Sequence, residues 1–384
     1  MSHSESSPAA EHGKSGTPPL QALGAAHAAH AAIAWPSTQR ADAFARWLAA
    51  QTGPQQLLPS SLRLASADAS FRRYFRIDSA LNGACGSRII MDAPPDKENC
   101  RPFVHVAGLM AQAGLNVPQI LAWDEPQGFM LLTDLGAHTL MQAIVREQAA
   151  AHLPLYRQAV DALVRWQLAS QPEVLPPYDA ALLRRELELF AEWYLARHRG
   201  VAVQGKLRET LDAMFALIVE RNLAWPSVYV HRDFMPRNLM VPADTAEPRL
   251  GVLDFQDAVY GPITYDIASL MRDAFLSWEE DFVLDITIRY WQQARAAGLP
   301  VGDDFGEFYR GVEWMGLQRH LKVAGIFARL TLRDGKPQYL ADTPRFIAYI
   351  RATCARYVEL KPLLRLIDEV EGIGEVTGYA YGRV

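Results

Sequence analysis

The sequence predicts a mixed α+β protein with two lobes, a small antiparallel β-sheet lobe first and a larger, mainly helical lobe after it. Short apolar or alternating segments typical of strands occur at residues 62–77, 88–91, 117–123 and 128–133. From residue 139 onward, the apolar residues recur at helical spacing. Between these two parts, residues 133–136 change from apolar to polar, as expected of a linker between lobes.

The pattern most typical of a chemical function lies beyond the middle of the chain. An apolar run leads to a His-Arg-Asp triplet that ends at Asp233, four residues separate it from Asn238, and a second apolar run ends at Asp254. This order is that of the catalytic loop and the metal-binding aspartate of protein kinases. Asp233 is therefore the candidate base for the acceptor hydroxyl, and Asn238 and Asp254 are candidate Mg²⁺ ligands. A buried aspartate cluster without catalysis is the alternative.

The first lobe is expected to begin with a helix over residues 41–51, where Phe44 and Leu48 share a face. The Gly-Pro pair at 53–54 is expected to end this helix. The following strands, within residues 62–77, are joined by a short turn.

The turn of this hairpin carries candidate nucleotide contacts. In the kinase template, a hairpin at this place covers the nucleotide phosphates, and glycines usually let its backbone approach them. Here Ala and Ser replace the glycines and arginines follow, so Ser70, Phe71 and Arg72 are the candidates. An ordinary hairpin with a basic face explains the same residues equally well.

The strand at residues 88–91 departs from the kinase template, which places a lysine there to pair with the nucleotide phosphates. This strand has no lysine. The candidates for that role are Lys97 beyond the strand and three arginines before it, Arg72, Arg73 and Arg76.

The end of the first lobe is expected to form the adenine site. A helix over residues 101–113 and two strands lead to the polar linker. Backbone groups near Leu132, Asp134 and Leu135 are the candidates to pair with adenine. A plain loop that closes a strand is the alternative.

The helical lobe begins near residue 139 and is divided by a Pro-rich break at 172–177. After the break, Phe190, Trp193 and Tyr194 stand beside basic residues. Aromatic rings with polar neighbours can stack on a sugar and bond its hydroxyls, so Tyr194 is a candidate substrate contact. A place in the hydrophobic core is the alternative.

Polar residues after the metal-binding aspartate supply the remaining candidates. Asp257 lies just outside the strand and is a candidate substrate contact. Asp266 precedes an apolar helix and is expected to cap it or to hold the catalytic loop through backbone N–H groups. Arg272 is a candidate for a substrate contact or a surface ion pair. Arg319 lies in an apolar helix over residues 305–330, where a cation needs an anionic ligand or a carboxylate of the protein itself.

Composition excludes several classes of protein. The net charge of −5 provides no basic field for a nucleic acid, and no apolar stretch is long enough to span a membrane. The N-terminus lacks a basic segment followed by an apolar run, so no secretory signal is expected. The three cysteines show neither metal spacing nor a disulfide framework, which favours a reducing cytoplasm.

The predicted organisation has four parts. Residues 1–38 are rich in Ala, Ser, Gly and Pro and are expected to be a disordered lead. Residues 39–134 form the lobe with the nucleotide-covering hairpin, and residues 135–371 form the helical lobe with the catalytic, metal and acceptor sites. The Gly-rich residues 372–384 are expected to be a mobile tail.

The order of these features resembles the aminoglycoside phosphotransferase and choline kinase family, which has a bilobal protein-kinase-like fold, over about residues 42–370. Within that family, the chain looks most like the bacterial kinases that phosphorylate N-acetylmuramate and N-acetylglucosamine at the anomeric hydroxyl. The stretches that carry this resemblance are residues 68–76, 91–95, 231–240, 253–258 and 265–270.

The resemblance implies an ATP- and Mg²⁺-dependent kinase that makes a sugar 1-phosphate in peptidoglycan recycling. Asp233 falls on the family's base position, Asn238 and Asp254 fall on its magnesium positions, and the missing strand lysine is normal for this branch. The resemblance implies ATP and a small amino sugar as partners. A monomer is an expectation for this chain that does not follow from the resemblance.

Two alternatives remain open from the sequence. A kinase of the same fold could act on an aminoglycoside or a choline-like alcohol. Cationic acceptors require an acidic lobe, whereas the many arginines of this helical lobe suit a neutral or anionic sugar. An inactive nucleotide-binding regulatory module is the other alternative, favoured by the absent lysine and opposed by the intact Asp233, Asn238 and Asp254.

Overall fold

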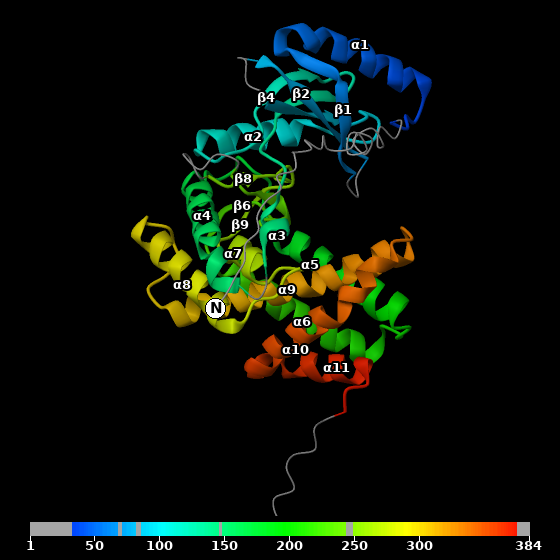
Figure 1. The fold of residues 1–384 in the computed structure, drawn as a ribbon. Coiled ribbons are helices and arrows are strands. Elements are labelled where there is room, and N and C mark those ends of the chain that lie inside the picture. The colour runs from blue at the N-terminus through cyan, green and yellow to red at the C-terminus, as the bar shows by residue number, and fades with distance from the viewer. Residues whose placement is uncertain (1–32, 68–70, 82–85, 146–147, 243–248, 375–384) are drawn as a thin grey trace, which may run out of the picture. The chain divides into compact units, whose positions relative to one another are not determined.

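The computed structural model describes residues 33–67, 71–81, 86–145, 148–242 and 249–374 (Figure 1). The chain divides into two compact units, Met1–Asp92 and Ala93–Val384. The lobe boundary expected at residue 134 stays a prediction. The predictions for residues 1–32, residues 375–384 and Ser70 concern residues outside the described ranges.

The described part of the first unit contains one helix and three strands. They are α1 (Thr38–Gln55), β1 (Leu57–Ala67), β2 (Arg73–Ser79) and β3 (Gly86–Asp92). Strand β2 pairs antiparallel with β1 on one side and with β3 on the other. The rings of Trp35, Phe44 and Phe75 pack together with centroids 4.7–5.8 Å apart; Phe44 and Phe75 are buried, and Trp35 is half-buried.

Several elements of this unit have other bounds than predicted. Helix α1 begins at Thr38 and β1 at Leu57, where the sequence predicted residues 41 and 62. The described chain starts at residue 33: Trp35 packs on Phe44, and the Ser37 side chain caps α1 by accepting a hydrogen bond from the Arg40 N–H at 3.1 Å. The helix also continues past Pro54 to Gln55. It ends where Gln56 takes up a left-handed backbone with φ 46° and its N–H bonds the Gly53 carbonyl.

The second unit opens with a helix, a hairpin and two further helices. Their bounds are α2 (Arg101–Gln112), β4 (Ile120–Asp124), β5 (Phe129–Thr133), α3 (Leu140–Ala143) and α4 (Ala149–Leu168). Strands β4 and β5 pair antiparallel. Gly128 in their turn has φ 69°, and a Cβ there would lie 1.9 Å from the Ala93 carbonyl oxygen, so the turn requires glycine.

The Pro-rich break is followed by α5 (Ala180–Leu189), the π-helix η4 (Phe190–His198) and α6 (Gly205–Leu223). Two short antiparallel ribbons come next. One pairs β6 (Ser227–Val230) with β9 (Val259–Pro262), and the other pairs β7 (Leu239–Met240), just after the 3₁₀ turn η5 (Pro236–Asn238), with β8 (Gly251–Val252). These ribbons hold the segment that carries the kinase motif.

Helices complete the second unit. They are α7 (Thr264–Met271), α8 (Glu280–Ala296), α9 (Phe305–Leu332), η6 (Pro337–Asp342), α10 (Thr343–Arg356), η7 (Val358–Leu360) and α11 (Lys361–Glu371). Helix α9 is central, since it packs against α5, η4, α7 and α10. The predicted fold class, strands first and helices after them in a mixed α+β protein, is confirmed.

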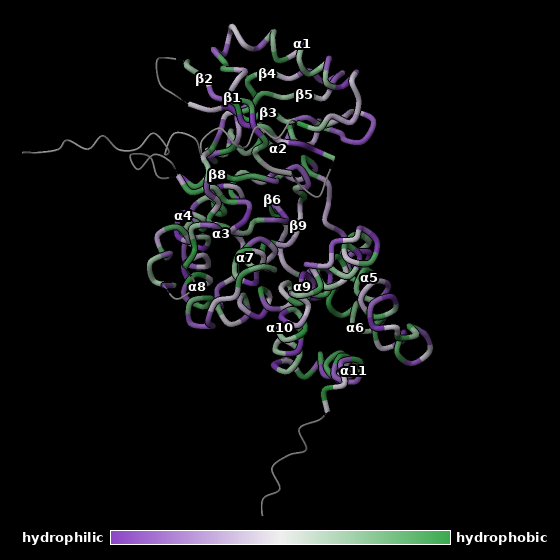
Figure 2. The backbone as a smooth tube through the Cα atoms, turned by 45° about the vertical axis from the view of Figure 1, so that its right-hand side comes forward, coloured by the Kyte–Doolittle hydropathy of each residue, from purple (hydrophilic) through white to green (hydrophobic). Residues whose placement is uncertain are grey.

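The helices at the end of the chain are amphipathic. Figure 2 shows hydrophobic and hydrophilic residues alternating along α11, whose Leu363, Leu366 and Ile367 are buried. Among the residues with a described structure, no helix combines the length and the apolar character that a bilayer crossing requires.

Candidate active site

The predicted catalytic loop leaves β6 and is held by a buried carboxylate from α7. Asp266 accepts hydrogen bonds from the backbone N–H groups of His231 at 2.7 Å and Arg232 at 3.0 Å. Burial raises the pKa of Asp266 to about 7, and the two N–H donors oppose that rise. The expected structural role of Asp266 is confirmed, because its oxygens fix the backbone that precedes Asp233.

His231 orients the same loop as a neutral side chain. Burial lowers the pKa of His231 to about 4, so the ring is uncharged at neutral pH. Its Nε2 lies 3.0 Å from the Leu253 carbonyl oxygen, and its Nδ1 accepts from the Asp233 N–H at 3.2 Å. These partners assign the proton to Nε2. His231 therefore links the chain before Asp254 to the backbone of Asp233.

The structure brings Asp233, Asn238 and Asp254 together. The Asn238 amide nitrogen donates to the Asp233 carbonyl oxygen at 2.9 Å and to Asp254 Oδ2 at 3.3 Å. Gln256 donates to Asp254 Oδ1 at 2.8 Å. Within the described chain, the carboxylate of Asp233 accepts no hydrogen bond, so it is available to a ligand.

The residues present fit a hard cation. Asn238 uses its N–H donors within the protein, toward the Asp233 carbonyl and the Asp254 carboxylate, which leaves its Oδ1 to serve as an oxygen ligand. In the described ranges, no three His, Cys, Asp or Glu side chains are grouped as a closed metal site. Mg²⁺ in phosphoryl-transfer sites is held by one or two carboxylates and by the substrate phosphates, and this donor set matches that arrangement.

The candidate adenine segment lies beside the strand that leads to Asp254. Leu132 is buried at the end of β5, and the Asp134 side chain accepts from the Gly136 N–H at 3.0 Å. Leu135 packs on β8, since a Cβ added to Gly251 would lie 2.8 Å from Leu135 Cδ1. The linker and the metal-binding strand are therefore neighbours within the second unit.

The basic residues of the first unit have partners of their own. Asp92 is fully buried and accepts hydrogen bonds from Arg73 Nε and Arg40 Nε, each at 3.0 Å. Arg73 is thus held by a carboxylate. Phe71 and Arg72, the described candidates of the hairpin, also lie in this unit, with the Phe71 side chain 60% exposed.

Tyr194 lies in a different part of the second unit from the catalytic loop. The Tyr194 hydroxyl donates to Glu371 at 2.7 Å, and its ring stacks on Phe190. It lines a cavity of about 390 Å³ between η4, α10 and α11, which shares no lining residue with the catalytic loop. The core alternative describes its environment, since the residue is 2% exposed.

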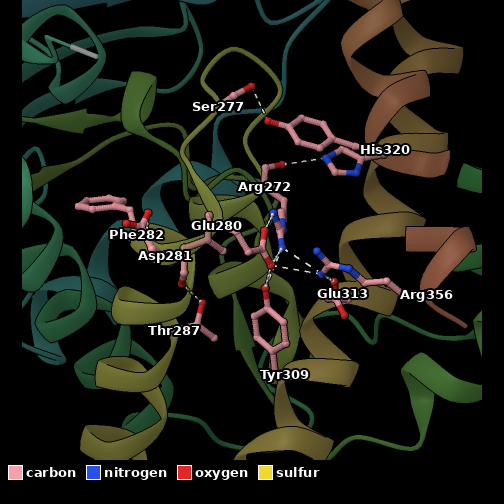
Figure 3. Close-up of polar contacts among 12 residues, drawn as sticks. Arg272, Ser277, Glu280, Asp281, Phe282, Thr287, Tyr309, Glu313, His320 and Arg356 are labelled. Atoms are coloured by element: carbon pink, nitrogen blue, oxygen red, sulfur yellow. Dashed lines mark hydrogen bonds and ion pairs between the residues drawn. The ribbon is translucent and has the colours of Figure 1, made fainter. Parts of the chain in front are cut away.

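The other substrate candidates are largely engaged by the protein. Figure 3 shows the Arg272 guanidinium against Glu280, with two contacts of 3.0 Å, and its bond to the Tyr309 hydroxyl is 2.9 Å long. Arg319 is buried and donates to the Arg232 carbonyl oxygen at 2.7 Å. The Asp257 side chain is exposed.

One group of charged residues near the site belongs to no motif in the sequence. Glu186 of α5 and Lys322 of α9 form an ion pair of 2.9 Å, and Glu186 also binds Arg232 at 2.7 Å. Glu186 and Arg232 are 46 residues apart, so no local motif joins them. For Lys322, the sequence indicates only that a cation in an apolar helix needs an acidic partner.

Comparison with known proteins shows the family of the chain. A model described as the phosphotransferase enzyme family matches residues 61–301. The chain is 50% identical over 322 residues to the N-acetylmuramate/N-acetylglucosamine kinase of Neisseria meningitidis serogroup B, covering 83% of this chain and 94% of that one. It is 50% identical over 309 residues to the same-named kinase of Pseudomonas aeruginosa, covering 80% of this chain and 88% of that one.

Solved structures share the fold at low sequence identity. A Plasmodium vivax ethanolamine kinase aligns with TM-score 0.53 and 11% identity, covering 77% of this chain and 83% of that chain. A choline kinase of Streptococcus pneumoniae aligns with TM-score 0.53 and 12% identity, covering 80% and 99%. These neighbours confirm the kinase-like fold class.

Proposed function

Because the chain belongs to the phosphotransferase enzyme family, we propose that it transfers the γ-phosphoryl group of ATP to the anomeric hydroxyl of N-acetylmuramate and N-acetylglucosamine. The observation that carries the proposal is the convergence of Asp233, Asn238 and Asp254. The relatives at 50% identity, which are named for these two sugars, support the acceptor.

In the proposed reaction, Asp233 accepts the proton of the sugar hydroxyl as that oxygen attacks the γ-phosphorus. The unbonded carboxylate suits this role, since a base must reach the proton without first breaking a bond within the protein. ADP leaves as the oxygen–phosphorus bond to the sugar forms. Mg²⁺, where bound, supplies neutralisation of the phosphate charge, and Asn238 and Asp254 are the residues that would hold it.

ATP as the phosphoryl donor rests on the family and on the fold neighbours. One neighbour, aminoglycoside phosphotransferase APH(2'')-IIa, was solved as a ternary complex with streptomycin and ATP and aligns with TM-score 0.52 at 13% identity. In the proposal, Leu132, Asp134 and Leu135 contact the adenine, and Ser70, Phe71 and Arg72 contact the phosphates. We place this enzyme in the cytoplasm, where ATP is available. Its sugar 1-phosphate product would enter peptidoglycan recycling.

The proposed acceptor contacts come from Asp257, Tyr194, Arg272 and Arg319. Asp257 is exposed beside the metal-binding segment, which suits a hydrogen bond to a sugar hydroxyl. Contacts from Tyr194, Arg272 and Arg319 stay predictions, and the bonds of these residues to Glu371, Glu280 and the Arg232 carbonyl would have to be shared with the sugar.

The test is an ADP-release assay with N-acetylmuramate, N-acetylglucosamine, kanamycin and choline, each with Mg·ATP. We expect release with the two amino sugars, and ³¹P NMR of the product should show a sugar 1-phosphate. Release with kanamycin or choline alone would replace the proposed acceptor. No release with any acceptor would favour an inactive nucleotide-binding module.

A further inference from the structure

We propose that Glu186 is a positioning residue for the catalytic loop, acting through Arg232. The inference rests on the proposed role of Asp233 as the base. It concerns a carboxylate on α5, outside the kinase motif, whose contacts converge on the residue immediately before Asp233.

The contact between the two residues is a desolvated ion pair. Glu186 Oε1 lies 2.7 Å from Arg232 Nη2, and the two side chains are only 6% and 19% exposed. The second oxygen of Glu186 accepts from the Tyr178 hydroxyl, and Lys322 approaches Oε1 at 2.9 Å. A carboxylate enclosed by three donors has one orientation, so it offers Arg232 a fixed anchor.

Charge favours the ionised form of this anchor. Burial raises the pKa of Glu186, but Lys322 and Arg232 outweigh burial and hold the pKa below its usual range. Two cations share one buried anion. Loss of the carboxylate would therefore leave both Arg232 and Lys322 without their close acidic partner in the described structure.

Arg232 needs an anchor because its backbone is in an unusual conformation. Its φ of 76° lies in the left-handed region, which is strained for a residue with a side chain. Its N–H donates to Asp266 and its carbonyl accepts from Arg319, while the guanidinium is held by Glu186. The backbone and the side chain are thus fixed from separate helices, and the next residue in the chain is Asp233.

The Arg232 side chain also reaches the segment beyond the metal ligand. Its Nη1 lies 3.4 Å from the Asp257 carbonyl oxygen. Glu186 therefore holds, through one guanidinium, both the loop that carries the proposed base and the chain three residues after Asp254. A shift of this guanidinium would move the base relative to the metal site.

The matched control is Glu188, on the same helix. Glu188 also pairs with two arginines, accepting from Arg184 at 2.7 Å and from Arg208 at 2.7 and 2.8 Å. Among the described residues, no hydrogen bond or ion pair joins Glu188 to the catalytic loop. E186Q and E188Q each remove one paired carboxylate charge with little change in shape. Their difference separates an effect on the loop from a general loss of charge pairing.

We expect E186Q to lower kcat by about 10- to 100-fold with the KM for ATP and sugar changed by less than about twofold, because misplacement of a reacting group affects the transition state more than binding. E188Q should leave kcat near the wild-type value. Amide hydrogen exchange of residues 231–238 should be faster in E186Q than in E188Q. Equal kcat and equal exchange in the two variants would overturn the proposal.

A comparison of R232M with E186Q/R232M tests whether Glu186 acts through Arg232. It does not need the single variant E186Q, so it remains possible if that variant fails to fold. If Glu186 acts only through Arg232, then R232M and E186Q/R232M, where both charges are gone, should have the same kcat. A further tenfold loss in the double variant would show that Glu186 acts elsewhere. The exchange measurement needs no acceptor, so a wild-type enzyme that fails to phosphorylate amino sugars would refute the proposed function while leaving the positioning role measurable.

Discussion

Arg232 and Asp254 are non-glycine residues with left-handed backbone, at φ 76° and φ 64°, and they stand next to or at the proposed catalytic groups. Such conformations cost of order 1–3 kcal/mol each and persist only where the surroundings enforce them. Asp266 and Arg319 enforce the first, and hydrogen bonds from Asn238 and Gln256 hold the carboxylate of the second. Both residues therefore depend on these contacts to keep the backbone at the proposed site in place.

Among single residues, Asp233 can be tested as the proposed base with the Asp233→Asn variant. An amide cannot accept the proton of the sugar hydroxyl, so we expect kcat to fall by about 10²- to 10⁴-fold. The affinity for Mg·ATP should stay close to that of the wild type, because Asp233 is not assigned to the nucleotide. Steady-state kinetics and calorimetric titration with a nonhydrolysable ATP analogue measure the two quantities. A variant with wild-type turnover would remove Asp233 from the mechanism.

Helix α9 shows how an element positions the site without entering it. One end of its buried stretch places Arg319 on the catalytic loop, and a later turn crosses the junction of α5 and the π-helix η4. That crossing depends on Gly325. A Cβ there would lie 2.3 Å from the Leu189 carbonyl carbon and 2.7 Å from the Phe190 nitrogen, which are backbone atoms that cannot rotate away.

The consequence is a stability prediction for Gly325→Ala. The added methyl group must push the helices apart, which should lower the free energy of unfolding by about 1–3 kcal/mol. Gly108→Ala in α2 is the control, because its Cβ meets nothing within 4 Å and alanine favours helix by up to about 1 kcal/mol. Urea unfolding followed by tryptophan fluorescence compares them. Equal midpoints for the two variants would contradict the close crossing.

The same helix carries a buried histidine that makes stability depend on pH. His320 stacks on Tyr349 at 4.8 Å, and its Nε2 lies 3.2 Å from the Arg272 carbonyl oxygen, a contact visible in Figure 3. Burial, then the neighbouring charges of Arg272 and Arg319, lower the pKa of His320 to about 3. In the unfolded chain the same imidazole titrates near 6.5, a standard value.

Below about pH 6.5, the imidazole of His320 is protonated in the unfolded state but stays neutral in the folded state. The contribution of His320 to stability is therefore complete above about pH 6.5 and is lost as pH falls toward the folded pKa, by about 3 kcal/mol at pH 4. His320→Gln should remove this part of the slope. Unfolding free energies of both proteins from pH 7 to pH 4 measure it, and parallel curves would show that His320 is not buried uncharged.

At the scale of the whole molecule, ligand binding and stability are linked. A ligand that binds only the folded state stabilises it, by about 2.7 kcal/mol at a hundredfold excess over Kd. We expect Mg·ADP to raise the Tm of the wild type more than ADP with a chelator does. Asp254→Ala should abolish that Mg²⁺-dependent difference, because its carboxylate is the charged ligand proposed for the ion.

Asp257→Ala is the control for that measurement, since Asp257 lies in the same segment and is assigned to the acceptor. Its Mg²⁺-dependent rise in Tm should match that of the wild type. A full rise in Asp254→Ala, seen by scanning fluorimetry at matched nucleotide concentration, would refute the metal assignment. Loss of the rise in both variants would point to damage of the whole segment.

Apolar periodicity predicted the approximate places of the main helices and strands. The spacing of Asp233, Asn238 and Asp254 pointed to residues that the Asn238 amide joins, through the Asp233 carbonyl and the Asp254 carboxylate, and their roles in catalysis and metal binding stay predictions. The ends of elements were predicted less well. Pro54 did not end its helix, which continues to Gln55, and half-buried Trp35 packs on Phe44, because tertiary packing can outweigh local preference.

The amino-acid order by itself determined the fold class, the family and the three residues proposed for chemistry, because each depends on residues close together in the chain. Only the tertiary structure decided which buried charges meet. Arg232 binds Glu186, which is 46 residues away in the sequence, and Arg319, which is 87 residues away. Such pairs leave no periodic pattern in the sequence. They depend on how the helices pack and on the free-energy cost of burying a charge without a partner.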